Sequence, residues 1–370
     1  MKPSQSSVHS IARRWTGSSR RHFLAAAGVA SASIAFPRIA AATSSFPTLA
    51  GRTVTMVIGS DIGGGYDLFG RAIARHLQKL VPDLQVNIQN IGKAGGKLAA
   101  KMIQDGPSDG SLIAMLPVSL MSAQILQEEG VAYDVASWSW IGKLASEARL
   151  YLAGPGADFA TIAELRARGS IAPMAVRSTS SFAYYEAMCI NAILGIKVKP
   201  VPGYKSGEKE QAMMSGEVML VSANYPDDRN VIDAPGVRVV LRVNAAEIPD
   251  PYGQAPTLRG LLGQSEQHGT VLKFLEANYE LARWLVAPPN TDPAVLQDWR
   301  AAFDATVGSE GFLKEAKTLD MPIAPMPGAE LANRIHEILS DEERLRADLS
   351  SAFTCGKSLV EGVAGACHQS

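Results

Sequence analysis

Three consecutive glycines between a buried strand and an amphipathic helix are the residues of this chain best suited to bind a ligand. They lie in the loop Gly59–Asp67 (GSDIGGGYD), after the apolar run Thr53–Gly59 and before the periodic segment Asp67–Leu80. Glycine lets a ligand approach the backbone closely, and the N–H groups and dipole of a helix start attract negative charge. The loop therefore predicts an anion site, with Asp67 as the helix N-cap. The predicted site residues here are Ile62, Gly63, Gly64, Gly65, Tyr66 and Asp67.

Hydroxyl and amide side chains follow other predicted strands in the same manner. Loops at the carboxyl ends of parallel strands gather at one edge of a sheet, so we expect these side chains to face the same cleft as the glycines. The alternatives are that the hydroxyls only cap helices and that the glycines only ease a turn. The predicted site residues of this kind are Ser119, Ser178, Thr179, Ser180, Ser181 and Asn224.

Motifs for nucleotide binding and hydrolysis match only in part. The loop Gly92–Leu98 (GKAGGKL) is one residue short of a phosphate-binding loop, with Leu98 where Ser or Thr would hold Mg²⁺. The segment Gly106–Gly110 matches GxSxG, but it is predicted to join a helix to a strand, whereas a nucleophile elbow joins a strand to a helix. We predict no catalytic residue, no metal site and no cofactor. An enzyme on the same fold is the alternative.

The first 42 residues have the pattern of an export signal. They carry six basic residues and no acidic one, and Arg20-Arg21 precede the weakly apolar run Phe23–Phe36 and the small residues Ala40–Ala42. That order is typical of a cleavable signal peptide, and paired arginines before Phe-Leu resemble a twin-arginine signal. The alternative is an ordinary secretory signal with a chance arginine pair. The run Phe23–Phe36 is too short to span a membrane, which needs roughly 18–20 apolar residues. We therefore predict a periplasmic protein whose mature chain does not insert into the membrane.

The charge and the cysteine content further limit the kinds of binding partner and metal site that we expect. The whole chain has 35 basic and 36 acidic residues, and the signal holds six of the basic ones, so the mature part is acidic. Without a basic patch, no nucleic-acid partner is predicted. The three cysteines show no zinc spacing. Cys189 lies on an apolar helical stretch and is expected in the core, whereas Cys355 and Cys367 can either pair or stay reduced.

Two blocks of alternating strands and helices predict an α/β fold of two lobes with a cleft between them. The first lobe is predicted at 43–150 plus 285–370, and the second, inserted lobe at 151–284. An insertion requires two chain crossings, expected near Leu150–Gly154 and near Tyr279–Ala287. A double crossing of this kind can act as a hinge.

Taken in order, these loops resemble the substrate-binding receptors of tripartite tricarboxylate transporters, also called the Bug family. No single motif is decisive, but five occur in the family's order across nearly all of the mature chain. The matching segments are Ile62–Asp67, Asn90–Gly96, Pro107–Gly110, Tyr204–Val218 and Ala287–Phe303.

The resemblance implies a type II periplasmic-binding-protein fold that closes around its ligand like a Venus flytrap. It also implies a small organic carboxylate as ligand, either a di- or tricarboxylate or an aromatic acid, and membrane permease subunits of a tripartite transporter as partners. It adds Tyr204 to the predicted site. Two departures stand out, since Ile62 replaces the family's Pro and Tyr66 replaces a small polar residue. Tyr66 is expected to narrow the pocket or to stack against a ring. The alternative is a receptor that senses its ligand or binds a signalling protein instead of a transporter.

Overall fold

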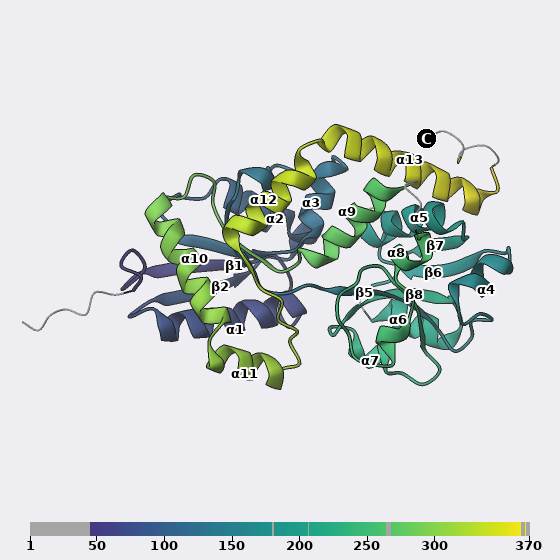
Figure 1. Ribbon diagram of the computed structural model, residues 1–370, viewed down its shortest axis with the longest axis horizontal. Helices are drawn as coiled ribbons and strands as arrows, with labels where there is room; N and C mark the ends of the chain where they lie inside the picture. The colour runs from purple at the N-terminus through teal and green to yellow at the C-terminus, as the bar shows by residue number, and fades with distance from the viewer. Residues whose placement is uncertain (1–44, 180, 206, 264–267, 364–366, 368–370) are drawn as a thin grey trace, which may run out of the picture. The chain divides into compact units, whose positions relative to one another are not determined.

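Two separate β-sheets, each flanked by helices, make up the described part of the chain (Figure 1). The computed structural model describes residues 45–179, 181–205, 207–263, 268–363 and 367. The predicted signal peptide at 1–42 and the predicted site residue Ser180 lie outside the described residues. The two sheets with their helices confirm the predicted α/β class.

The first sheet has six strands in the order β11-β4-β10-β3-β1-β2. Strands β1, β2 and β3 are parallel, as the alternation of strands and helices predicted, whereas β10 is antiparallel to both β3 and β4. Every residue of β3 and β10 is buried, which explains why both read as continuous apolar runs. The strands are β1 (Thr53–Ile58), β2 (Gln85–Asn90), β3 (Leu112–Leu116), β4 (Ser139–Lys143), β10 (Trp284–Ala287) and β11 (Met326–Pro327).

The second sheet has five strands in the order β7-β6-β8-β5-β9. Strand β6 is parallel to β7 and β8, and β5 is antiparallel to β8 and β9. All six residues of β5 are buried. The strands are β5 (Ala148–Ala153), β6 (Ala172–Val176), β7 (Val198–Pro202), β8 (Leu220–Tyr225) and β9 (Arg238–Arg242).

The helices cover the sheets and bury apolar side chains against them. Helix α10 starts with Pro293 after the N-cap Asp292, whose Oδ1 accepts hydrogen bonds from two backbone N–H groups of the first turn. Its Trp299 and Phe303 are fully buried, and a side chain at Gly142 of β4 would collide with the Phe303 ring. The helices are α1 (Gly65–Leu80), α2 (Lys97–Gln104), α3 (Ser119–Ile125), α4 (Ile162–Ala167), α5 (Phe182–Leu194), α6 (Glu208–Ser215), α7 (Arg229–Ile232), α8 (Leu258–Leu262), α9 (Gly269–Glu280), α10 (Pro293–Val307), α11 (Glu310–Thr318), α12 (Gly328–Leu339) and α13 (Glu342–Glu361).

The chain passes between the strands of the two sheets twice, and a third passage leads from α12 to α13. It leaves the first sheet through residues 144–147, between β4 and β5, and returns through residues 281–283, between α9 and β10. The boundary predicted after residue 150 therefore falls inside β5. Helix α13 packs on α5, beside the second sheet, although the prediction placed all of 285–370 with the first lobe.

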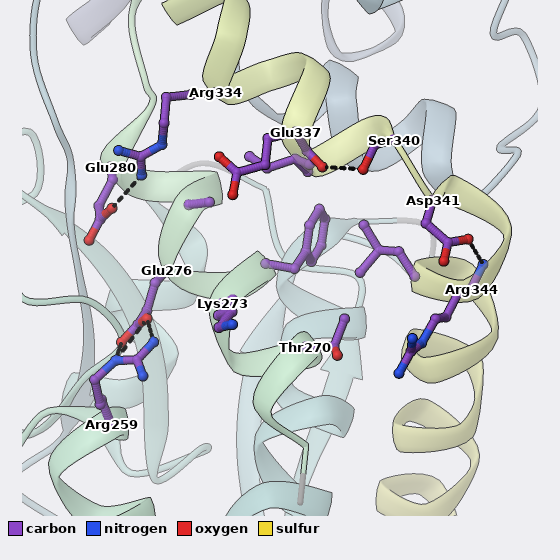
Figure 2. Close-up of a pocket in the computed structure, with 14 residues that line it drawn as sticks. Arg259, Thr270, Lys273, Glu276, Glu280, Arg334, Glu337, Ser340, Asp341 and Arg344 are labelled. Atoms are coloured by element: carbon purple, nitrogen blue, oxygen red, sulfur yellow. Dashed lines mark hydrogen bonds and ion pairs between the residues drawn. The ribbon is translucent and has the colours of Figure 1, made fainter. Parts of the chain in front are cut away.

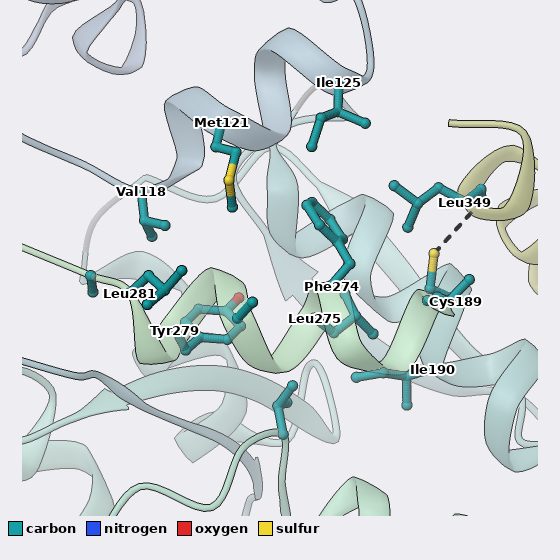
Figure 3. Packing of buried hydrophobic residues seen from close by; sticks show 14 of the residues in the cluster. Val118, Met121, Ile125, Cys189, Ile190, Phe274, Leu275, Tyr279, Leu281 and Leu349 are labelled. Carbon is teal, nitrogen blue, oxygen red and sulfur yellow. Dashed lines mark hydrogen bonds between the residues drawn. The ribbon is translucent and has the colours of Figure 1, made fainter. Parts of the chain in front are cut away.

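One apolar cluster connects helices that are far apart in the sequence (Figure 3). Met121 of α3, Ile190 of α5, Phe274 of α9 and Leu349 of α13 all belong to it, and each is almost completely buried. Cys189 of α5 is fully buried in the same cluster, as expected for a core residue. Because the cluster also contains residues of both sheets, it joins them on the side of α9 and α13.

The sequence left open whether Cys355 and Cys367 pair. In the structure they form a disulfide. Cys355 lies in α13, so the disulfide links Cys367 back to this helix. Cys189 is the free cysteine of the chain.

The close packing of α13 on α5 predicts that Gly356→Ala destabilises the fold. A Cβ at Gly356 would lie 1.8 Å from the carbonyl oxygen of Met188, so the two helices must move apart. We expect a loss of about 1–3 kcal/mol in the free energy of unfolding, measured by urea denaturation. Gly269→Ala in α9 is the control, because a Cβ there meets nothing within 4 Å. Equal stability of both variants would contradict the packing of these helices.

Candidate functional site

The glycine loop leads directly into α1, and Asp67 holds the loop from inside the fold. Gly64, not Asp67, is the N-cap of α1, so the predicted capping role of Asp67 is wrong. Asp67 lies in the first helical turn, where its Oδ2 accepts a hydrogen bond from the Gly63 N–H at 2.9 Å. Its Oδ1 accepts from Arg71 Nε at 2.8 Å and from Asn90 Nδ2 at 2.9 Å. Burial raises the pKa of Asp67, but these hydrogen bonds outweigh it and lower the pKa below its usual value.

A pocket of about 570 Å³ lies beside this loop. The loop and α1 form one wall through Gly63–Gly65 and Arg71, and residues 319–321 add to it from the end of α11. The opposite wall is Pro226–Asp228, which follows β8 of the second sheet. The pocket therefore lies between loops that belong to different sheets.

Gly65 allows a carboxylate of the opposite wall to rest on the start of α1. A Cβ built on Gly65 would lie 2.2 Å from Asp227 Oδ2 and 2.7 Å from both other atoms of that carboxylate. Any larger residue at position 65 would push Asp227 away. Gly63 has a φ of +84°, a backbone conformation that favours glycine. Gly64 has ordinary extended dihedrals, and a Cβ there would meet only the Asp61 carbonyl oxygen, at 3.7 Å.

The cation that holds Asp227 is Arg283, at the return crossing between the sheets. Its side chain is only 1 % exposed, and its Nη2 donates to Asp227 Oδ2 at 2.9 Å. The same Nη2 is 3.7 Å from Glu147 Oε1. The guanidinium also lies over the rings of Phe69 and Tyr66 in α1, 4.2 Å and 4.9 Å from their centroids. Arg283 thus makes both charge–charge and cation–π contacts.

Further buried charges extend from Arg283 into the second sheet. Glu147 lies at the first crossing and is 4 % exposed, and its Oε2 accepts from Asn224 Nδ2 at 2.8 Å. Asn224 Oδ1 accepts in turn from Arg149 Nη1 at 3.1 Å, and Arg149 Nε donates to Glu186 at 3.1 Å. Burial raises the pKa of Glu147, against the lowering effect of Arg283. We call Arg283, Glu147, Asp227, Asn224, Arg149 and Glu186 the crossing network.

The predicted site residues divide into those that reach the pocket and those that do not. Gly63, Gly64, Gly65 and Asp67 line the pocket, whereas Tyr66 and Asn224 contact the crossing network. Among the described residues, the pocket wall includes none of the other predicted ones. They are Ile62, which is 77 % exposed; Ser119, at the start of α3; Ser178, Thr179 and Ser181, in the loop before α5; and Tyr204, whose hydroxyl donates to Glu217.

Ser181 does not take the alternative role of a side-chain cap for α5. Ser181 is the N-cap of α5, but its hydroxyl makes no capping bond and donates to the Ser178 carbonyl oxygen at 2.7 Å. Thr179 in the same loop is exposed.

The sequence reasoning missed the charged residues of the crossing network. Arg283 had a visible signal, because it is the one charged residue in the apolar run Leu281–Ala287. A charge in such a run must be paired when the run is buried, since an unpaired buried charge is very unfavourable. Glu147 and Arg149 similarly flank the start of the buried strand β5.

A second pocket, of about 640 Å³, lies between α9, α12 and α13 (Figure 2). Two of its arginines are paired with carboxylates of the same pocket, Arg259 with Glu276 and Arg334 with Glu280. It has no glycine loop, and these positive charges are already neutralised. The candidate anion site is therefore the pocket beside Gly63–Gly65, which contains the glycine loop.

Two other features are absent from the described residues. They contain no group of three or more His, Cys, Asp or Glu side chains placed to hold a metal ion. Nor does any described helix have the length and apolar character needed to cross a membrane.

Comparison with known proteins supports the resemblance stated from the sequence. No protein-family model matches the chain. A curated relative, the UPF0065 protein in gbd 5'region of Cupriavidus necator, is 25% identical over 345 residues, which are 90% of this chain and 98% of that protein. The similarity therefore extends over almost the whole of both chains.

Solved structures with a similar fold include a solute binding protein and a periplasmic binding protein. A TctC solute binding protein from Polaromonas has a TM-score of 0.62 and 16% identity, covering 81% of this chain and 98% of its own. R. palustris Rpa4515 with adipate has a TM-score of 0.61 and 18% identity, covering 81% and 97%. MatC from Rhodopseudomonas palustris with bound malate has a TM-score of 0.58 and 21% identity, covering 80% and 99%. The chain thus has the fold of this class and is similar to the receptors of tripartite tricarboxylate transporters.

The crossing network predicts that Arg283→Met destabilises the protein strongly. The substitution leaves Glu147 and Asp227 without their cation, and breaking a buried ion pair on one side typically costs about 3–5 kcal/mol. Arg334→Met is the control, because its pair with Glu280 is half exposed and should contribute less than about 1 kcal/mol. Urea unfolding at neutral pH measures both. Similar losses in the two variants would contradict the buried role of Arg283.

Proposed function

We propose that this chain is an exported solute-binding receptor that captures a small organic carboxylate and delivers it to the membrane subunits of a tripartite transporter. The ligand class is a di- or tricarboxylate or an aromatic acid. The observation that carries the proposal is the pocket in which Gly63–Gly65, at the start of α1, face Pro226–Asp228 of the second sheet. The adipate and malate bound to two structures of the same fold support the ligand class.

The physical case for an anion rests on the groups around the glycine loop. Helix α1 has 16 residues, so the N–H groups and the dipole at its start favour a negative charge. The pocket wall also contains Arg71, and Arg283 lies directly behind Asp227. Because the two walls come from different sheets, a ligand between them would bind both and favour the closed arrangement.

The proposal also includes export of the protein and binding of the ligand without a chemical reaction. The pattern of residues 1–42 favours the twin-arginine route to the periplasm, and solved structures of this fold include one named as periplasmic binding protein BugD. We propose that binding leaves the ligand chemically unchanged. Chromatography of a bound carboxylate, released by denaturing the protein after long incubation, tests this directly, because a product in place of the ligand would indicate an enzyme.

A matching carboxylate should raise the melting temperature of the purified mature protein. Binding to the folded state alone stabilises it by RT ln(1 + [L]/Kd), about 2.7 kcal/mol at 100 times Kd. A thermal-shift panel of mono-, di-, tri- and aromatic carboxylates, with adipate and malate included, makes the measurement. The corresponding neutral amides are the control ligands. A panel with no shift for any carboxylate would reject the proposed ligand class.

Gly64→Val should fold but lose the ligand. The backbone of Gly64 is extended, and its surroundings leave room for a Cβ, so we expect a ligand-free melting temperature close to that of the wild type. The valine side chain would instead fill the space through which a ligand reaches the loop backbone. Calorimetric titration with the best carboxylate of the panel should show at least about a 100-fold weaker affinity, the scale of a lost charged hydrogen bond plus a steric block. Unchanged affinity would place the ligand elsewhere.

A further inference from the structure

We propose that the carboxylate of Asp227 occupies the receptor's anion subsite when no ligand is bound, and that a ligand carboxylate binds by replacing it on Arg283 at the start of α1. This inference rests on the proposed function, because it assigns the residues that receive one carboxylate of the ligand. It also makes Asp227 an internal competitor that sets the affinity of the site.

The first support is the position of Asp227. Its carboxylate lies on the Cα of Gly65, where a single Cβ would overlap all three of its terminal atoms. This is the first residue of α1, the position at which the glycine loop is expected to receive a negative group. The residue in contact comes from the opposite wall, 162 positions further along the chain, so the contact forms only when the two walls are close.

The second support is the incomplete pairing of Arg283. Although its side chain is 99 % removed from solvent, its Nε and Nη1 have no hydrogen-bond partner among the residues that the structure describes. Its Nη2 binds Asp227 at 2.9 Å, while Glu147 is farther away at 3.7 Å. A buried guanidinium with free donors requires a carboxylate, and a carboxylate that binds through two oxygens satisfies it better than Asp227 does.

The side chains of Asp227 and Arg283 differ in their freedom to move. The side chain of Asp227 is 29 % exposed and lies in the loop after β8, so it can turn toward water and be solvated there. Arg283 is enclosed beneath Phe69 and Tyr66 and cannot follow it. The buried cation therefore stays in place, and it remains paired with a carboxylate when that of a ligand replaces that of Asp227.

The other acidic residues of this pocket have different partners. Asp228 Oδ2 accepts from the backbone N–H of Asn224 at 2.8 Å, which fixes its own loop. Asp320 pairs with Arg229 near the surface. Neither carboxylate is paired with Arg283, so Asp320 provides a matched control with the same charge in the lining of the same pocket.

The test compares Asp227→Ala with Asp320→Ala and the wild type, using acetate as the probe. Acetate can fill the space left by the Asp227 carboxylate and pair with Arg283. As acetate replaces chloride at constant ionic strength, we expect the melting temperature of Asp227→Ala to rise by about 2 °C or more beyond the change in the other two proteins. An equal response in all three proteins would overturn the inference. If Asp227→Ala does not fold, Asp227→Ser also removes the carboxylate and leaves its space open, and the same acetate response is required of it.

A second measurement tests the competition itself. For a carboxylate that binds the wild type, affinity should increase by about tenfold or more in the Asp227 variant that folds, and by less than about threefold in Asp320→Ala. Unchanged or weaker binding in the Asp227 variant would overturn the inference and leave the proposed function standing. If the wild type binds no carboxylate of the panel, the proposed function fails, and the acetate response still decides whether Arg283 and the start of α1 form an anion subsite.

Discussion

The loops of the two sheets are held together at the pocket because one buried cation must be neutralised. Arg283 is almost completely removed from water, and an unpaired charge in that position would be very unfavourable. Its partners come from three separate parts of the chain, namely Asp227 after β8, Glu147 at the first crossing, and the aromatic rings of α1. The loops that form the pocket are therefore held together by the same charge that is suited to receive a ligand.

The two sides of the molecule differ in what joins the sheets. On the side of α9 and α13 the contact is an apolar cluster, which is stable only while it excludes water (Figure 3). On the side of the glycine loop the contacts are ionic, with Asp227 on Arg283 and Arg229 on Asp320, and water or a ligand can replace them. This difference favours opening on the ionic side, as a receptor that closes around a ligand requires.

Local patterns in the sequence were enough to predict most of the fold. Thr53–Gly59, the glycine loop and the segment up to Leu80 were recognised because the periodicity and the glycines are contiguous. The first crossing was placed too late because Glu147 and Arg149, at the start of β5, are charged, so only the apolar residues from Leu150 onward were read as part of the new element, although all of β5 is buried. The N-cap was assigned to Asp67 because Asp is a common cap, but its hydrogen bonds to Gly63 and Arg71 hold it inside the first turn.

A pocket lies beside the glycine loop that the sequence singled out, while the charged residues next to it were not foreseen. Asp227 and Arg283 are 56 residues apart, and no local pattern predicts that they meet. Tyr66 was singled out as an unusual residue, and the structure places its ring against the guanidinium of Arg283. Its unusual size is thus connected with the buried cation, a relation that only the folded chain reveals.

The most direct test of carboxylate binding between the two sheets is a crystal structure of the mature protein with the tightest-binding carboxylate of the panel. We expect a carboxylate group of the ligand at the start of α1, within hydrogen-bond distance of Arg283, with the Asp227 side chain turned away from both. A ligand bound outside the pocket of Gly63–Gly65 and Pro226–Asp228, or one bound there with Asp227 still paired to Arg283, would contradict this.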